Sequence, residues 1–127
     1  MESRSRKVLG TVGSLNIALA LVFAVTAPTA AEVEAQSGRL WYDRCSQPDL
    51  TSQLACTSFI FGVNEVNTLL RLHNKLHLYC PPETSTIAQL RGTVMRYLDR
   101  HPEDLDKAFV VLVLESLREA FPCAEKI

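Results

Sequence analysis

Four cysteines are the residues of this 127-residue chain best suited to covalent chemistry. Cys45, Cys56, Cys80 and Cys123 all follow an apolar leader. An even number of cysteines in a small exported domain is typical of a disulfide framework. No two of them have the C-x-x-C spacing of a thiol redox motif or of a close pair of zinc ligands. We therefore expect all four to form structural disulfides.

Two histidines are the next candidates, for metal binding. His73 and His77 are four residues apart, which would place both on one face of a helix. In zinc peptidases with this spacing a glutamate follows the first histidine and acts as the base, whereas Asn74 follows here. The one further ligand nearby is Cys80, which we expect in a disulfide. With no G-x-S-x-G motif and no glycine-rich phosphate loop, we expect no metal, no cofactor and no enzymatic activity.

The leader has the order of a secretory signal. A basic start is followed by an unbroken apolar run over 17–25 and then by small residues. The run is short for a membrane span, so a stable anchor is not expected. We assign 1–31 to a cleaved signal peptide, with cleavage possible as late as Ala35, and 38–127 to one domain.

The charge of the exported part disfavours nucleic-acid binding. The chain's 13 basic and 14 acidic residues become 10 and 13 when the leader is removed after Ala31. This mildly acidic balance provides no basic stripe to bind phosphates.

Apolar spacing predicts that helices position the cysteines. A short helix over 39–44 precedes a long one that Cys80-Pro81-Pro82 ends, since proline cannot continue a helix. Gly62 lies inside the long helix, where it costs about 1 kcal/mol against alanine, and we expect it to allow close packing of a neighbour. The predicted core face of this helix consists of Ala55, Phe59, Val63, Val66, Leu70 and His73.

Two more helices are expected in the second half. Thr86 and Gln89 form a capping-box signal for the third, whose predicted buried stripe is Ile87, Leu90, Val94, Tyr97 and Leu98. A fourth helix is expected to begin at Pro102. It contains the apolar run 108–114, for which a buried strand is the alternative. A helix apolar on every face must be central or covered by a second subunit, which indicates a homodimer.

The helix order favours one of the three possible disulfide pairings. Cys45 and Cys56 flank a short turn between the first two helices. Cys80 precedes the third helix and Cys123 follows the fourth, so an antiparallel hairpin would bring them together. We expect Cys45–Cys56 and Cys80–Cys123. The stiff segments that remain exposed, 48–50 and 79–83, suit protein recognition, because little ordering entropy is lost on binding.

Taken together, the short motifs of this sequence resemble those of a known family. Tyr79-Cys80-Pro81, Thr86 with Gln89, Tyr97-Leu98, His101-Pro102 and Phe121-Pro122-Cys123 occur in the order found in the Rap/Tai family of periplasmic type VI secretion immunity proteins. The upstream cysteines, with Phe59 and Gly62, fit the same pattern, and the resemblance covers roughly 38–123.

The resemblance implies an all-α, four-helix domain with two disulfides, often a homodimer. It implies a periplasmic, non-catalytic protein that blocks a cell-wall amidase effector by inserting a surface element into the cleft of the enzyme. One alternative is an acid-activated periplasmic chaperone, for which His73, His77 and His101 would be the pH-sensitive groups. Another is an envelope protein with an unknown partner.

Overall fold

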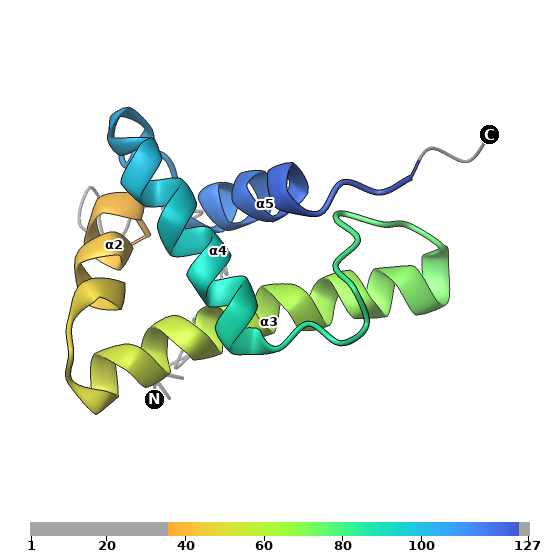
Figure 1. Ribbon diagram of the computed structural model, residues 1–127, viewed down its shortest axis with the longest axis horizontal. Coiled ribbons are helices and arrows are strands. Elements are labelled where there is room, and N and C mark those ends of the chain that lie inside the picture. The colour runs from red at the N-terminus through yellow and green to blue at the C-terminus, as the bar shows by residue number, and fades with distance from the viewer. Residues whose placement is uncertain (1–35, 125–127) are drawn as a thin grey trace, which may run out of the picture.

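The computed structural model describes residues 36–124 and, within them, an all-α domain (Figure 1). Its α-helices are α2 (Gly38–Ser46), α3 (Leu50–Asn74), α4 (Ile87–Arg100) and α5 (Phe109–Ala120), with a short 3-10 helix, η1 (Pro102–Asp104), before α5. The expected fold of four helices with two disulfides is confirmed. The predicted signal peptide lies outside the described residues.

The long helix α3 extends along one side of the domain, and the other helices pack against it. In Figure 1, α4 crosses α3 steeply, α5 lies behind α4, and α2 packs at the N-terminal end of α3. The C-terminal end of α3 and the connection from Lys75 to Thr86 extend away from α2. None of the described helices is both long and apolar enough to span a membrane.

Side-chain caps explain where three of the helices begin. Ser37 and Asp49 accept hydrogen bonds from backbone N–H groups in the first turns of α2 and α3. Thr86 and Gln89 form the complete capping box predicted for α4, because each side chain accepts from the backbone N–H of the other. Such caps satisfy backbone donors that have no partner within the helix.

The last helix begins later than we predicted. Pro102 opens η1, and α5 starts only at Phe109. The backbone between them pairs with the segment before α2: Gly38 N–H donates to the Lys107 carbonyl (2.8 Å), and Phe109 N–H donates to the Gln36 carbonyl (2.8 Å). These hydrogen bonds keep the backbone between Pro102 and Phe109 from continuing as one helix into α5. Gly38 permits the approach, since a Cβ there would collide with a methyl carbon of Leu112.

Aromatic packing joins α2, α3 and α5 where the half-buried Trp41 and Phe59 contact the buried Phe109. The rings of Trp41, Phe59 and Phe109 lie with centroids 4.6, 4.9 and 5.1 Å apart, within the range of favourable aromatic contacts. The fully buried side chains of the core include Ile60, Leu98, Leu112, Val113 and Leu117. Residues 109–114 are helical and largely covered by their own chain, so the alternative of a strand for the run 108–114 is wrong.

Of the residues predicted for the core face of α3, Phe59 and Val63 are half-buried and pack against the core, but the face as a whole is rotated from the predicted one. Its buried residues are Cys56, Ile60 and Asn67, whereas the predicted Val66 is 52% exposed. The predicted His73 is also exposed. Because α3 has apolar side chains on two faces, periodicity alone could not identify the one that packs inward.

Candidate functional site

Both disulfides have the expected partners, and they differ in position. Cys45–Cys56 joins α2 to α3 and is buried. Cys80–Cys123 is half-buried and joins the connection after α3 to the segment after α5, closing a sequence separation of 43 residues. The described chain contains no free cysteine. The second disulfide therefore anchors the segment that follows Tyr79.

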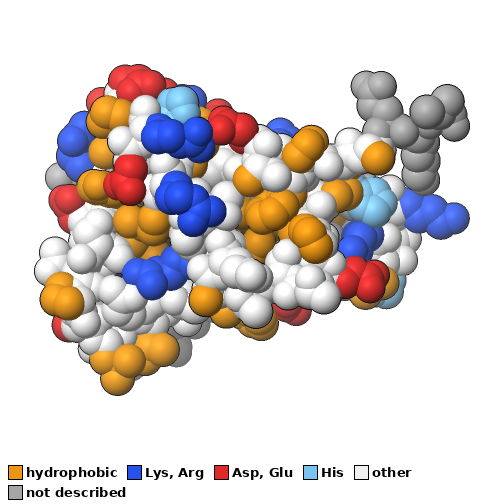
Figure 2. All heavy atoms as spheres, in the orientation of Figure 1, with side chains coloured by type: hydrophobic (Ala, Val, Ile, Leu, Met, Phe, Trp, Pro, Cys, Tyr) orange, Lys and Arg blue, Asp and Glu red, His pale blue; other side chains and the backbone are white. Residues whose placement is uncertain are grey.

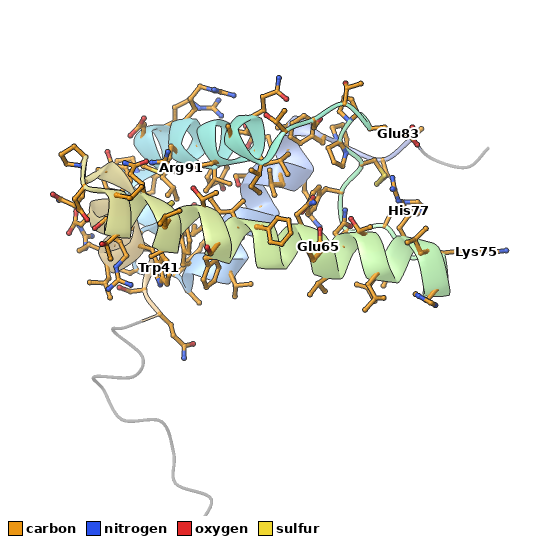
Figure 3. The ribbon with its side chains drawn as sticks, turned by 90° about the horizontal axis from the view of Figure 1, so that it is seen from below. Trp41, Glu65, Lys75, His77, Glu83 and Arg91 are labelled. Carbon is orange, nitrogen blue, oxygen red and sulfur yellow. A yellow bond between two sulfur atoms is a disulfide. The ribbon has the colours of Figure 1, made fainter. Side chains whose placement is uncertain are left out.

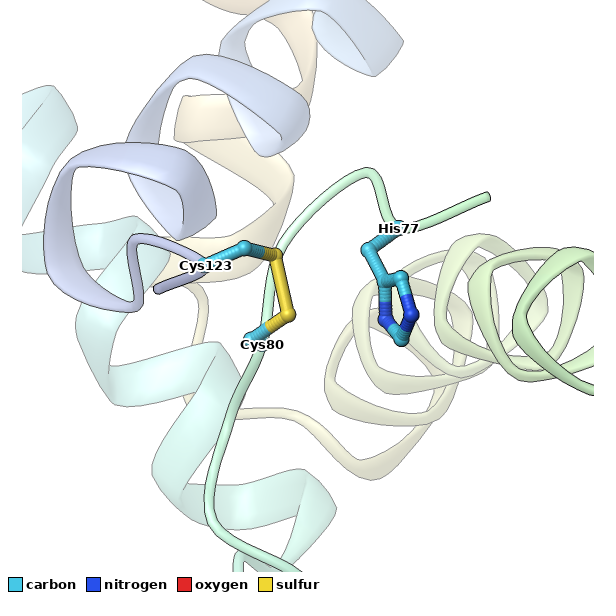
Figure 4. A group of neighbouring side chains, drawn as sticks. All are labelled: His77, Cys80 and Cys123. Carbon is cyan, nitrogen blue, oxygen red and sulfur yellow. A yellow bond between two sulfur atoms is a disulfide. The ribbon is translucent and has the colours of Figure 1, made fainter. Parts of the chain in front are cut away.

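The two histidines of the candidate metal pair do not share a helical face. His73 is in the last turn of α3, but the helix ends at Asn74, and Lys75 follows in the left-handed conformation (φ 54°). His77 lies beyond this turn, beside the disulfide of Cys80 (Figure 4). One of its ring nitrogens and the two sulfur atoms lie within 4.8 Å of one another, but a disulfide sulfur is not the thiolate that binds metals.

His101, Glu103 and Asp104 form a second cluster of possible ligands, near η1. His101 Nδ1 lies 3.2 Å from a carboxylate oxygen of Glu103, and Asp104 pairs with Lys107 at 3.2 Å. The partners are close in sequence and belong to the turn between α4 and α5. The cluster thus joins the two helices through contacts within that turn.

Asn67 fixes the start of the connection between α3 and α4, and sequence reasoning did not identify it. Its side chain is only 4% exposed. Its Oδ1 accepts from the backbone N–H of Leu78 (3.0 Å), and its Nδ2 donates to the carbonyl of Tyr79 (3.1 Å). One buried carboxamide therefore satisfies two backbone groups of a segment that has no helix or strand to pair with.

Helix α5 holds the same segment from the other side. Cys80 N–H donates to the Phe121 carbonyl (2.8 Å), and Arg118 Nε donates to the Leu78 carbonyl (3.0 Å). Together with Asn67 and the disulfide, these bonds fix the backbone on both sides of Tyr79. The exposed residues that follow Cys80 therefore project from a rigid base.

Tyr79 is the buried anchor of this base. Its side chain is 1% exposed, and its hydroxyl donates to Asn64 Oδ1 (3.2 Å). Burial raises the pKa of Tyr79 to about 12, because the phenolate would lose its hydration.

Because the buried Tyr79 has a raised pKa, we expect the protein to lose stability at high pH. The folded pKa of Tyr79 lies above the unfolded value of about 10, so its contribution is complete below pH 10 and is lost as the pH rises towards 12. Urea unfolding of the wild type between pH 9 and pH 12, compared with Tyr79→Phe, should show a steeper decline for the wild type. Parallel declines would contradict the assignment.

Residues 81–85 form a ridge between two hollows, which we call the proline ridge, and residues 82–84 of it are exposed. One hollow, of about 750 Å³, lies between the ridge, α4 and the end of α5. The other, of about 110 Å³, lies between the ridge and α3 and includes Asn67 and Arg71. Ser85 N–H donates to the Pro82 carbonyl (2.9 Å), which closes a turn at the top of the ridge. Glu83 projects from it (Figure 3).

The outward face of α3 is a second candidate surface. Leu54, Phe61, Leu69 and Leu72 are each 50–69% exposed and recur at helical spacing along α3. Gly62 lies beside them, and a Cβ at this glycine would meet no atom of the described chain within 4 Å. The neighbour that Gly62 was expected to accommodate is therefore not one of the described residues.

The comparisons with known proteins gave one match. A family model described as Rap1a immunity proteins matches residues 37–123. No curated protein and no solved structure matches the chain. The matched region begins one residue before α2 and ends at the second cysteine of the Cys80–Cys123 disulfide.

Proposed function

Because the chain belongs to the Rap1a immunity protein family, we propose that it is a non-catalytic periplasmic inhibitor that blocks a cell-wall amidase effector of type VI secretion. Residues 1–31 would be the signal peptide, with cleavage as late as Ala35, and 38–127 the inhibitory domain. Two disulfides suit an oxidising compartment. Immunity to an effector requires binding of that protein without turnover.

The observation that carries this proposal is the rigid proline ridge. A segment that enters an enzyme cleft must protrude, and it must already hold its bound conformation if little entropy is to be lost. Residues 81–85 meet both conditions, since they stand between two hollows on a base fixed by the disulfide, Asn67 and α5. The hollows would receive the two rims of the cleft.

A pull-down tests the proposed function. The tagged chain is expressed with its own leader, recovered from the periplasm and analysed by mass spectrometry. We expect one stoichiometric partner, a peptidoglycan amidase, whose activity on cell-wall fragments the purified chain abolishes. Many substoichiometric envelope proteins, captured mainly after acidification, would support the alternative of an acid-activated chaperone. Full amidase activity in the presence of the bound chain would contradict the inhibitor proposal.

Variants of the proline ridge test where the partner binds. We expect Pro82→Gly combined with Glu83→Arg to raise the Kd for the effector about 100-fold, because the ridge loses stiffness and reverses its charge. The matched control is Pro48→Gly with Asp49→Asn in the other exposed turn, where asparagine preserves the helix cap. Isothermal titration calorimetry measures both. Equal affinities for the two variants would place the contact elsewhere.

We also propose that the chain forms a homodimer through the outward face of α3. Exposed leucine and phenylalanine side chains surround a glycine that has no packing partner in the described chain. Glycine lets two helices approach closely, and a second copy of α3 would supply the partner. The run 108–114, from which a dimer was first expected, leaves only Val110 and Val111 about 40% exposed.

The substitution Gly62→Gln distinguishes an effect on dimerisation from an effect on folding. Glutamine at this exposed helix position should raise the stability of the monomer by about 0.5–1 kcal/mol, whereas its bulk should weaken the dimer at least tenfold. Val111→Gln is the matched control, and it should leave the dimer unchanged. Sedimentation equilibrium measures both. If Val111→Gln alone weakens the dimer, the interface lies on α5, and a monomer at all concentrations would refute dimerisation.

A further inference from the structure

The larger hollow beside the proline ridge has an unusual floor. A stripe along α4 forms it, consisting of Ala88, Gln89, Gly92, Thr93 and Arg96. Pro82, Thr84 and Ser85 form one wall, and Ala120 and Phe121 form the other. In Figure 2 the surface between α4 and the end of α5 is mainly white and orange, the colours of uncharged side chains and backbone. Apart from Arg96, the hollow is thus lined by uncharged residues.

Gly92 is one of the residues of this floor. A Cβ at Gly92 would meet one atom, a terminal nitrogen of the flexible Arg96 side chain, at 3.4 Å. No contact within the described chain therefore requires glycine here, although glycine inside a helix costs about 1 kcal/mol against alanine. Glycine does let another backbone approach the helix closely. This feature fits an extended peptide lying across α4.

Arg96 sets the charge of the hollow. It is the one charged residue of the lining, and its side chain is exposed. It donates to Thr93 Oγ1 (3.1 Å), which holds the guanidinium along the helix and leaves further N–H donors for a ligand. The carboxamide oxygen of Gln89 is occupied by Thr86 N–H (2.8 Å), so its amino group is available as a donor. These groups favour a carboxylate.

We propose that this hollow binds an extended segment of the effector that carries an aspartate or glutamate, with its backbone over Gly92 and its carboxylate at Arg96. The inference rests on the proposed function, because the hollow shares Pro82, Thr84 and Ser85 with the proline ridge. The proposed pairing of Arg96 with a carboxylate concerns one rim of the effector cleft, namely the rim that would lie on the α4 side of the proline ridge.

A peptide titration tests the hollow without the effector. The probes are acetyl-Gly-Glu-Gly-amide and its glutamine analogue, added to the isotope-labelled periplasmic chain and followed by amide NMR shifts. We expect the acidic peptide to shift the amides of residues 88–96 and to bind at least fivefold more tightly than the analogue. Arg96→Glu should abolish the shifts, and Arg44→Glu, an equal charge change on α2, should preserve them. Equal binding of both peptides, or shifts confined to other helices, would overturn the site.

The identified effector then tests the occupant. Arg96→Glu and Gly92→Gln should each raise the Kd for the effector at least tenfold, whereas Arg44→Glu should leave it unchanged. Unchanged binding by both hollow variants would overturn the inference and leave the inhibitor proposal intact. If the wild type captured no amidase, the proposed function would fail. The peptide titration would still test the hollow, because it does not involve the effector.

Discussion

Replacing Cys80 and Cys123 together with alanine is expected to lower the free energy of unfolding by about 4 kcal/mol. The disulfide spans 43 residues, and chain-entropy theory gives about this value for a loop of such length. Both residues are only half-buried, so the substitutions add little cavity cost. For a small domain whose net stability is about 5–10 kcal/mol, this loss is a large fraction of the total. Urea unfolding followed by circular dichroism measures it.

Removing the other disulfide provides the control. Cys45 and Cys56 are separated by 11 residues, for which the same theory gives about 3 kcal/mol, and both are fully buried, so their loss adds a cavity. The two double variants should therefore be similarly unstable and differ in where protection is lost. Hydrogen exchange at Leu78, Tyr79 and Cys80 should accelerate selectively without Cys80–Cys123. Equal protection of these amides in both variants would contradict an anchoring role for that disulfide.

The features that the sequence predicted correctly depend on one local contact and on the order of helices, cysteines and motifs along the chain. The capping box of Thr86 and Gln89 involves two residues only three apart. The disulfide pairing followed from helix order alone. The resemblance to the immunity family, carried by short motifs in a fixed order, agrees with the family model over 37–123.

The features that the sequence did not predict depend on tertiary contacts. Helix α3 ends at Asn74 rather than near Cys80, through a left-handed Lys75, and a lysine gives no such signal in the sequence. The start of α5 at Phe109 depends on backbone pairing with Gln36 and Gly38, more than sixty residues earlier. The hollows exist because the chain reverses direction after α3. Apolar periodicity does not predict such a reversal. The segment 79–83 and Gln89 had been singled out from the sequence, but most of the lining residues on α3, α4 and α5 were missed.

Asn67 is the position where one substitution should have the largest effect on both stability and inhibition. Asn67→Leu keeps a side chain of similar size but leaves the backbone N–H of Leu78 and the carbonyl of Tyr79 without partners. A buried polar group without a partner costs about 1–3 kcal/mol, so we expect a loss of about 3 kcal/mol in the free energy of unfolding. Urea unfolding measures it.

The same substitution should weaken inhibition beyond its effect on folding. Asn67 holds the base of the proline ridge, so its loss lets the ridge sample conformations that do not fit the effector, and ordering them again on binding costs affinity. We expect the Kd for the effector to rise at least tenfold under conditions where the variant is fully folded. The control is Asn64→Ala, one turn earlier on α3, which removes only the acceptor of the Tyr79 hydroxyl and should cost about 1 kcal/mol. If Asn67→Leu is destabilised but binds the effector as tightly as the wild type, the ridge does not contact the effector, and the face of α3 becomes the stronger candidate.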